Sequence, residues 1–179
     1  MKKIGQSYRN LSRQSAGGEM LFELTKVEQF LAKYVARTRY ENVRQSGIVD
    51  QKKGDQSCEE TDLDGFAAEL LFARIFNLYP DLSESSEIAD GITKKGHTYD
   101  VKVTKYKKGY LLAGIHKKNK PCDFYVLFIG SFPRYQIAGF GDRDSLLSEA
   151  MVKDFGKGPV YAMSQDDPKF KQFKKTGAV

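Results

Sequence analysis

The segment Tyr99–Gly109, YDVKVTKYKKG, holds the pattern around which the rest of the chain can be arranged. Apolar and polar side chains alternate through its first half, which predicts a strand with two different faces. Asp100 and Lys102 lie two residues apart and therefore project from the same face. They form either an exposed ion pair of little energetic value or part of a functional site, and the surrounding sequence has to decide between the two.

The composition indicates a globular protein, because 40% of the 179 residues are hydrophobic and 29% are charged. We expect an N-terminal arm and long helix over residues 1–57, packed on a core over residues 58–179 that ends in a basic tail. This length suits one compact domain containing both parts.

Several features of the chain point to a cytoplasmic protein without a membrane partner. No apolar run approaches the roughly 20 residues that cross a bilayer, and no apolar segment follows the basic N-terminus. The two cysteines are too few for a disulfide framework or a structural zinc site.

Hydrophobic periodicity predicts one helix over residues 19–45, a loop over 46–57 and a second helix over 61–78 that is apolar nearly all round. Strand patterns follow at 87–92, 98–105, 110–115, 124–130 and 135–140, then a short helix within 142–156 and an edge strand within 158–164. The predicted fold class is α/β (α+β), with a mixed central β-sheet flanked by helices and an N-terminal helical extension.

Charge is distributed unevenly along a chain whose net charge is +6. Residues 58–90 contain nine acidic residues and one basic residue, whereas residues 91–120 contain nine basic residues and one acidic residue. Tyrosines interrupt the basic block, which suits phosphate contacts from loops on one side of a domain. A solvated face would also produce such a run. The predicted nucleic-acid-binding residues are Lys94, Lys95, Lys105, Lys107, Lys108, Lys117, Lys118 and Lys120.

Three carboxylates accompany Lys102. Glu69 lies inside the apolar arc of the second helix, where it needs a cation or a metal unless it reaches an arginine at the helix edge. Asp90 belongs to an Asp-Gly pair that is common in turns, but it ends a predicted strand beside Asp100. Carboxylates from one helix and two adjacent strands are the oxygen ligands that Mg²⁺ prefers, and a nearby lysine can orient a water or stabilise charge on a phosphate.

In order and spacing, these residues resemble the PD-(D/E)XK nuclease superfamily, which has the restriction-endonuclease-like fold. The resemblance covers residues 61–140 and rests on Glu69 in GFAAELLFA, Asp90 in IADG, and Asp100 and Lys102 in YDVKVT. Ala89 stands where the family name has proline. The family core also inserts a helix between later strands, whereas LLAGIHKKNK (residues 111–120) reads as more strand-like.

The resemblance implies an Mg²⁺-dependent deoxyribonuclease in which Mn²⁺ can substitute. Asp90, Asp100 and Glu69 would bind the metal together with the carbonyl of Val101, and Lys102 would position the attacking water. The expected partner is DNA, with RNA as an alternative, and a homodimer would bring two such sites to two strands.

Two other classes of function stay open. A non-catalytic nucleic-acid-binding protein could use the basic surface of residues 91–120 and keep Asp100 and Lys102 as a surface pair. An interaction protein could present the same surface to an acidic partner. The buried position expected for Glu69 favours the nuclease, because a protein that only binds has no need of it.

Overall fold

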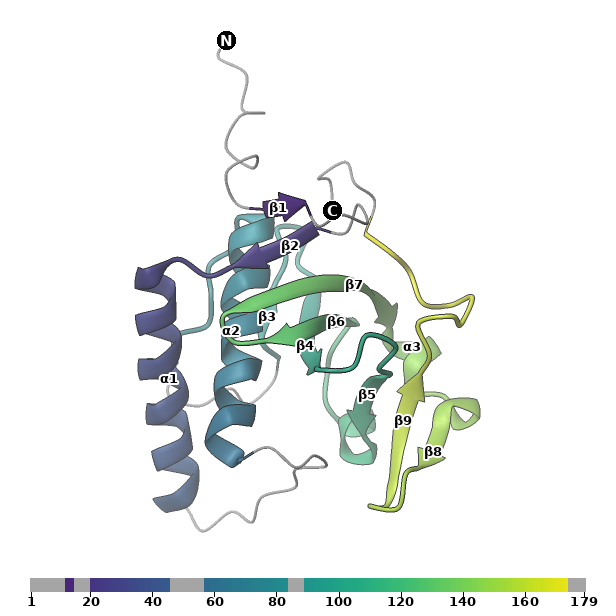
Figure 1. Ribbon diagram of the computed structural model, residues 1–179. Helices are drawn as coiled ribbons and strands as arrows, with labels where there is room; N and C mark the ends of the chain where they lie inside the picture. The colour runs from purple at the N-terminus through teal and green to yellow at the C-terminus, as the bar shows by residue number, and fades with distance from the viewer. Residues whose placement is uncertain (1–11, 15–19, 46–56, 84–88, 174–179) are drawn as a thin grey trace.

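The computed structural model describes residues 12–14, 20–45, 57–83 and 89–173 (Figure 1). The central sheet has the spatial strand order β1 (Ser12–Gln14), β2 (Met20–Glu23), β7 (Arg134–Asp142), β6 (Phe124–Ser131), β4 (Thr98–Thr104) and β3 (Gly91–Ile92). β4 and β6 run parallel, and every other neighbouring pair in this sheet is antiparallel. The predicted mixed sheet is therefore confirmed.

Two long helices, α1 (Lys26–Gln45) and α2 (Cys58–Phe76), lie on one side of this sheet, and a second sheet lies on the other (Figure 1). The second sheet is antiparallel, in the order β5 (Leu111–Gly114), β9 (Pro159–Met163) and β8 (Val152–Asp154). Three short helical segments complete the described chain: η3 (Ile115–Asn119), α3 (Arg143–Leu146) and η4 (Glu149–Met151).

Each face of the central sheet has its own hydrophobic core. Val101, Val126 and Phe128 on one face pack with side chains of α1 and α2. Tyr125 and Leu127 on the other face pack with the second sheet. Because α1 shares the first core with α2 and β4, the packing continues across the predicted boundary at residues 57 and 58.

The first helix begins later than the sequence predicts, at Lys26 rather than at residue 19. The apolar residues before it form β2, which pairs with β7. A capping box marks the true start: the Thr25 N–H donates to Glu28 Oε2 at 2.7 Å, and the Glu28 N–H donates to Thr25 Oγ1 at 3.3 Å. The short apolar run is compatible with either a strand or a helix, so the cap decides the boundary.

The second helix also begins at a capping box, formed by Ser57 and Glu60. It therefore starts before the predicted residue 61, and it ends at Asn77, whose φ of 52° is left-handed. Phe66, Leu71 and Phe72 are buried, as its nearly continuous apolar surface predicts.

The later elements have the predicted type, helix or strand, but differ from the prediction in position or extent. The predicted edge strand within 158–164 is β9, which lies at the centre of the second sheet because β5 and β8 pair with its two sides. The predicted helix within 142–156 is confined to α3 and η4, since β8 is drawn into that sheet. The predicted loop over 46–57 lies outside the described residues except for Ser57. Among the described helices, none combines the length and apolar character needed to cross a bilayer.

Candidate active site

The candidate site lies at the edge of the central sheet, beside β4. β3 is two residues long and pairs only with Tyr99 and Thr98, so the rest of β4 has no strand partner on that side within the described chain. The Val101 N–H donates instead to Asp90 Oδ2 at 2.6 Å. Because a side chain takes the place of a neighbouring strand, the Asp90 carboxylate lies directly beside the middle of β4.

Asp100 is the centre of the cluster and is only 1% exposed. The Lys102 ammonium group contacts its Oδ1, and the Lys117 ammonium group contacts its Oδ2. Burial alone would raise the pKa of Asp100, but the two lysines outweigh burial and lower that pKa below its ordinary value. The pKa of Lys102 is raised, because Asp100 and Asp90 outweigh the opposing effect of burial.

Glu69 reaches the same cluster from α2. Its Oε2 accepts a hydrogen bond from Arg39 Nη1 at 3.1 Å, and Arg39 also donates to the backbone carbonyls of Asp81 and Ser83, each at 3.0 Å. Burial, followed by the negative charge of Asp90, raises the pKa of Glu69 to about 8 despite Arg39. The helix-edge arrangement with an arginine, one of the alternatives for Glu69, is thus present alongside the carboxylate cluster.

The carboxylates interact electrostatically with one another. Burial and the charge of Asp100 raise the pKa of Asp90 to about 6, while Lys102 and Lys117 oppose this shift. Asp90 in turn raises the pKa of Glu69. Asp90 therefore interacts with both Glu69 and Asp100, and Arg39, Lys102 and Lys117 supply the opposing positive charge.

The connection between β4 and β6 explains how Lys117 comes to lie beside Asp100. Two parallel neighbours cannot be joined by a tight turn, so the chain leaves β4, forms β5 and η3, and returns to the start of β6. This route carries η3 back past Asp100. His116, the residue before Lys117, has its pKa lowered by burial and then by Lys117, Lys120 and Lys102. Positive charge beside the cluster thus also acts on His116.

All four residues predicted to be catalytic, Glu69, Asp90, Asp100 and Lys102, belong to this cluster. Val101, whose carbonyl was predicted as a metal ligand, is 4% exposed and donates its N–H to Asp90. The metal-binding role of its carbonyl stays a prediction.

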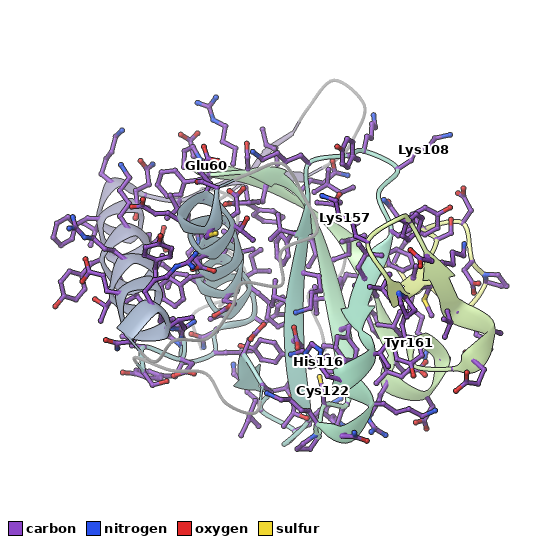
Figure 2. All side chains as sticks on the ribbon, turned by 90° about the horizontal axis from the view of Figure 1, so that it is seen from below. Glu60, Lys108, His116, Cys122, Lys157 and Tyr161 are labelled. Carbon is purple, nitrogen blue, oxygen red and sulfur yellow. The ribbon has the colours of Figure 1, made fainter. Side chains whose placement is uncertain are left out.

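The predicted basic surface is divided by the fold. Lys94 and Lys95 lie in the turn before β4, and Lys117, Lys118 and Lys120 lie in or beside η3, near the same end of that strand. Lys105, Lys107 and Lys108 follow the other end of β4. In Figure 2, which views the molecule from below, the labelled residues Lys108 and His116 lie far apart. The expectation of loops gathered on one side is corrected, because a strand of seven residues separates the two groups.

Individual lysines also differ in what they contact. Lys117 faces Asp100, whereas Lys118 donates to Glu149 Oε1 at 3.0 Å and has a side chain that is 53% exposed. Their assignment to nucleic-acid binding stays a prediction.

Two members of the cluster were missed as site residues. Arg39 was not singled out in the sequence, and Lys117 was predicted only as a nucleic-acid-binding lysine. Arg39 meets Glu69 across 30 positions of sequence, and Lys117 meets Asp100 across 17 positions. No local spacing signals either contact, because both depend on how distant elements pack.

The donor chemistry of the cluster fits a hard divalent cation, but its present arrangement is not a formed metal site. Carboxylate oxygens from Glu69, Asp90 and Asp100 are ligands suited to Mg²⁺ or Mn²⁺. Within the described residues, however, no group of three or more histidine, cysteine, aspartate or glutamate side chains is arranged to hold a metal ion. Lysines also contact both oxygens of Asp100, so a cation that binds Asp100 would have to displace at least one of them.

The comparisons with known proteins concern the part of the chain that carries the cluster. No curated protein sequence and no solved structure matches this chain. Residues 18–137 match the family of unknown function DUF5843. This match spans well over half of the 179 residues and includes every member of the cluster, so the chain belongs to the DUF5843 family.

Proposed function

We propose that the protein is a magnesium-dependent nuclease that hydrolyses phosphodiester bonds in DNA. The observation that carries this proposal is the convergence of Glu69, Asp90 and Asp100 with Lys102 at an open edge of the central sheet. An ordinary surface ion pair would be solvated and weak, whereas Asp100 is buried and its carboxylate is shared between two lysines.

The residues divide the work according to their chemistry. Asp90, Asp100 and Glu69 would hold the cation, which supplies an activated water and neutralises charge on the phosphate. Arg39 fixes the orientation of Glu69 through its hydrogen bond. The Lys102 side chain is 30% exposed, and its ammonium group can donate a hydrogen bond to a water or to a phosphate oxygen.

The electrostatics around the cluster support an anionic substrate. Burial, followed by the charges of Lys117 and Lys120, lowers the pKa of His116, so part of this shift reflects positive charge beside the cluster. A phosphate approaching from solvent would meet this positive charge before it reaches the buried carboxylates.

A cleavage assay tests the proposal directly. The full chain is incubated with supercoiled plasmid, linear duplex, single-stranded DNA and RNA, in Mg²⁺, in Mn²⁺ and in EDTA. We expect metal-dependent cleavage that is lost in the variants Asp90→Asn and Lys102→Gln. Asp144→Asn is the matched control, because its side chain is 96% exposed and lies outside the cluster.

Metal binding is measured on the same variants by calorimetry, without a substrate. Wild type and Asp144→Asn should bind Mn²⁺ equally, and Asp90→Asn should bind it more weakly. If Asp90→Asn and Lys102→Gln cleave as fast as wild type, the assignment of the site is wrong.

One observation favours a second candidate, a non-catalytic nucleic-acid-binding protein. Both oxygens of Asp100 contact ammonium groups, so the cluster is also complete as a set of internal ion pairs. In that case no substrate is cut and no Mn²⁺ is bound, while salt-sensitive binding of nucleic acid is retained.

A further inference from the structure

The outer face of the second sheet carries an aromatic and cationic cluster away from the carboxylates. The rings of Tyr110 and Phe155 lie 5.5 Å apart between centroids at an interplanar angle of 49°. Lys153 Nζ lies 4.5 Å from the centroid of the Tyr110 ring, and Phe155 is still 55% exposed. A large apolar ring therefore stays open to solvent although a neighbouring ring and a lysine support it.

The register places Lys153 on one face of the second sheet. Leu112 pairs with Ala162, and Lys153 pairs with Val160. Because side chains alternate along a strand, Lys153 lies on the same face of the sheet as Leu112 and Ala162. Tyr110 directly precedes β5 and Phe155 directly follows β8, at opposite ends of β9, and the contact between their rings joins the two ends.

The loop between β4 and β5 adds a second open ring. Tyr106 is 76% exposed, and its carbonyl accepts the Gly109 N–H at 2.8 Å. Gln165 Nε2 donates to the carbonyls of Lys107 and Gly109 at 3.1 and 2.8 Å. These bonds hold the backbone of the loop, so little ordering is required before a ligand can use the ring.

The hairpin that carries Phe155 is held in a similar way. Asp154 Oδ1 accepts the N–H groups of Gly156 and Gly158 at 2.7 and 3.1 Å. Both glycines have a left-handed φ, 85° and 84° respectively, which other residues rarely adopt. The only carboxylate in the hairpin is thereby directed toward its own backbone.

Lysines outnumber carboxylates in the segments around these rings, where the acidic residues are Asp154, Asp166 and Asp167. Figure 2 shows Lys108 and Lys157 on the side of the molecule away from the two long helices. The lysines of the two loops and of β8 are Lys105, Lys107, Lys108, Lys153 and Lys157. Open aromatic rings among lysines provide both stacking surfaces and phosphate contacts, which is the combination used by single-strand-binding proteins.

We propose that the exposed rings of Tyr106 and Phe155, together with Tyr110 and Lys153, bind an unpaired strand of nucleic acid by stacking bases on Tyr106 and Phe155. A duplex cannot use the rings in this way, because its bases are already stacked and paired. The inference deepens the proposed function by naming a single strand as the form of nucleic acid that the protein holds. It does not require cleavage, so it can be tested without metal.

The absence of tryptophan from the sequence allows a direct test of stacking. Phe155→Trp and Tyr106→Trp each introduce one fluorophore, and Phe30→Trp is the control on α1, where Phe30 is 73% exposed. Unlabelled oligothymidylate is added in EDTA. Stacking should quench the tryptophans at 155 and 106 but not the one at 30, and a blunt duplex of the same length should quench none of them.

Affinity provides an independent measurement. By fluorescence anisotropy of a labelled oligothymidylate in EDTA, Phe155→Ala and Tyr106→Ala should each weaken binding about tenfold. Phe155→Tyr should restore it, and Phe30→Ala should have no effect. Lys153→Gln should weaken binding and reduce its salt dependence by about one released counterion. Circular dichroism checks that each variant is folded.

Three results would overturn this inference: equal quenching by duplex and single strand, wild-type affinity in both alanine variants, or Phe155-dependent binding to anionic lipid vesicles with no binding to oligonucleotides. The last result would make these rings a membrane contact. All of these binding experiments are done in EDTA. If they fail, the cleavage assay still tests whether the protein is a nuclease. Stacking without cleavage would refute only the nuclease.

Discussion

Asp64 and Asp100 are the two buried acidic side chains of the described chain, and their partners differ in kind. Asp64 Oδ1 accepts the Phe132 N–H at 2.7 Å and the Tyr135 hydroxyl at 2.9 Å. Asp100 faces the ammonium groups of Lys102 and Lys117. Asp64 thus accepts hydrogen bonds from at least two neutral donors, whereas Asp100 contacts two cations on long side chains.

The difference separates a structural carboxylate from one suited to chemistry. These two donors cannot leave Asp64 without disrupting the fold, because the Phe132 N–H belongs to the backbone and Tyr135 is fully buried. The lysines beside Asp100 have side chains that are 30% and 20% exposed, so they can turn toward solvent or toward a phosphate. Asp64 therefore joins α2 to the turn between β6 and β7, while Asp100 can exchange its partners.

The largest expected effect concerns cleavage by Asp100→Asn. This variant should lose metal-dependent cleavage by roughly a thousandfold, the range found when a key electrostatic group is removed from an active site. The measurement is the nicking rate of supercoiled plasmid at saturating Mg²⁺. Asp64→Asn is the control and should cleave at the wild-type rate per folded molecule. Equal losses in both variants would erase the distinction between the two carboxylates.

The next effect concerns stability. Asp64→Ala leaves the Phe132 N–H and the Tyr135 hydroxyl without this acceptor, and it should lower the free energy of unfolding by about 3 kcal/mol. Asp100→Asn should cost less, about 2 kcal/mol, because Lys102 and Lys117 are partly exposed and can turn toward water instead of staying unpaired. Urea denaturation followed by circular dichroism gives both values, with the exposed Asp144→Ala as the reference. A larger loss for Asp100→Asn would show that the lysine pairs are primarily structural.

Glu69 gives the metal-free protein a pH dependence. Its pKa is raised to about 8 by burial and Asp90, so between about pH 4.5 and 8 the unfolded state loses a proton that the folded state retains. The free energy of unfolding in EDTA should therefore fall as pH rises through this range, by the order of 5 kcal/mol. Glu69→Gln should flatten this part of the curve.

Glu41→Gln is the control for that measurement, because Glu41 is an exposed helix carboxylate paired with Arg37. Urea midpoints at several pH values are compared for the three proteins. A Glu69→Gln curve parallel to wild type would mean that Arg39 keeps Glu69 ionised throughout.

The smallest expected effect tests whether the partners of Asp100 are exchangeable. Lys117→Met removes one cation from Asp100 and should tighten Mn²⁺ binding about fivefold, which corresponds to roughly 1 kcal/mol of relieved charge repulsion. Lys118→Met is the neighbouring control, because Lys118 contacts Glu149 instead. Calorimetry in the absence of a substrate provides the measurement. Unchanged or weaker Mn²⁺ binding in Lys117→Met would contradict displacement of a lysine by the metal.

Local patterns predicted much of the fold. Alternation located β4, and continuous apolar runs located α2 and β6, because these signals depend on residues that are near in sequence. The start of α1 was placed too early, since an apolar run as short as Met20–Glu23 suits a strand as well as a helix. Only its pairing with β7 makes it a strand.

The candidate site shows where sequence information ends. Glu69, Asp90, Asp100 and Lys102 could be proposed because their residue types and order match a recognisable pattern. Arg39 and Lys117 complete the charge balance, yet neither has a local signature.

By itself, the sequence determined the mixed α and β class, the buried second helix and the four residues worth testing. Only the tertiary structure decided that Asp64 accepts hydrogen bonds from Phe132 and Tyr135, that Lys117 returns to Asp100 and that the lysine clusters lie at two ends of β4. The physical reason is the range of the interactions. Periodicity and capping act within a few residues, whereas burial, ion pairing and pKa shifts depend on groups that the fold brings together from distant parts of the chain.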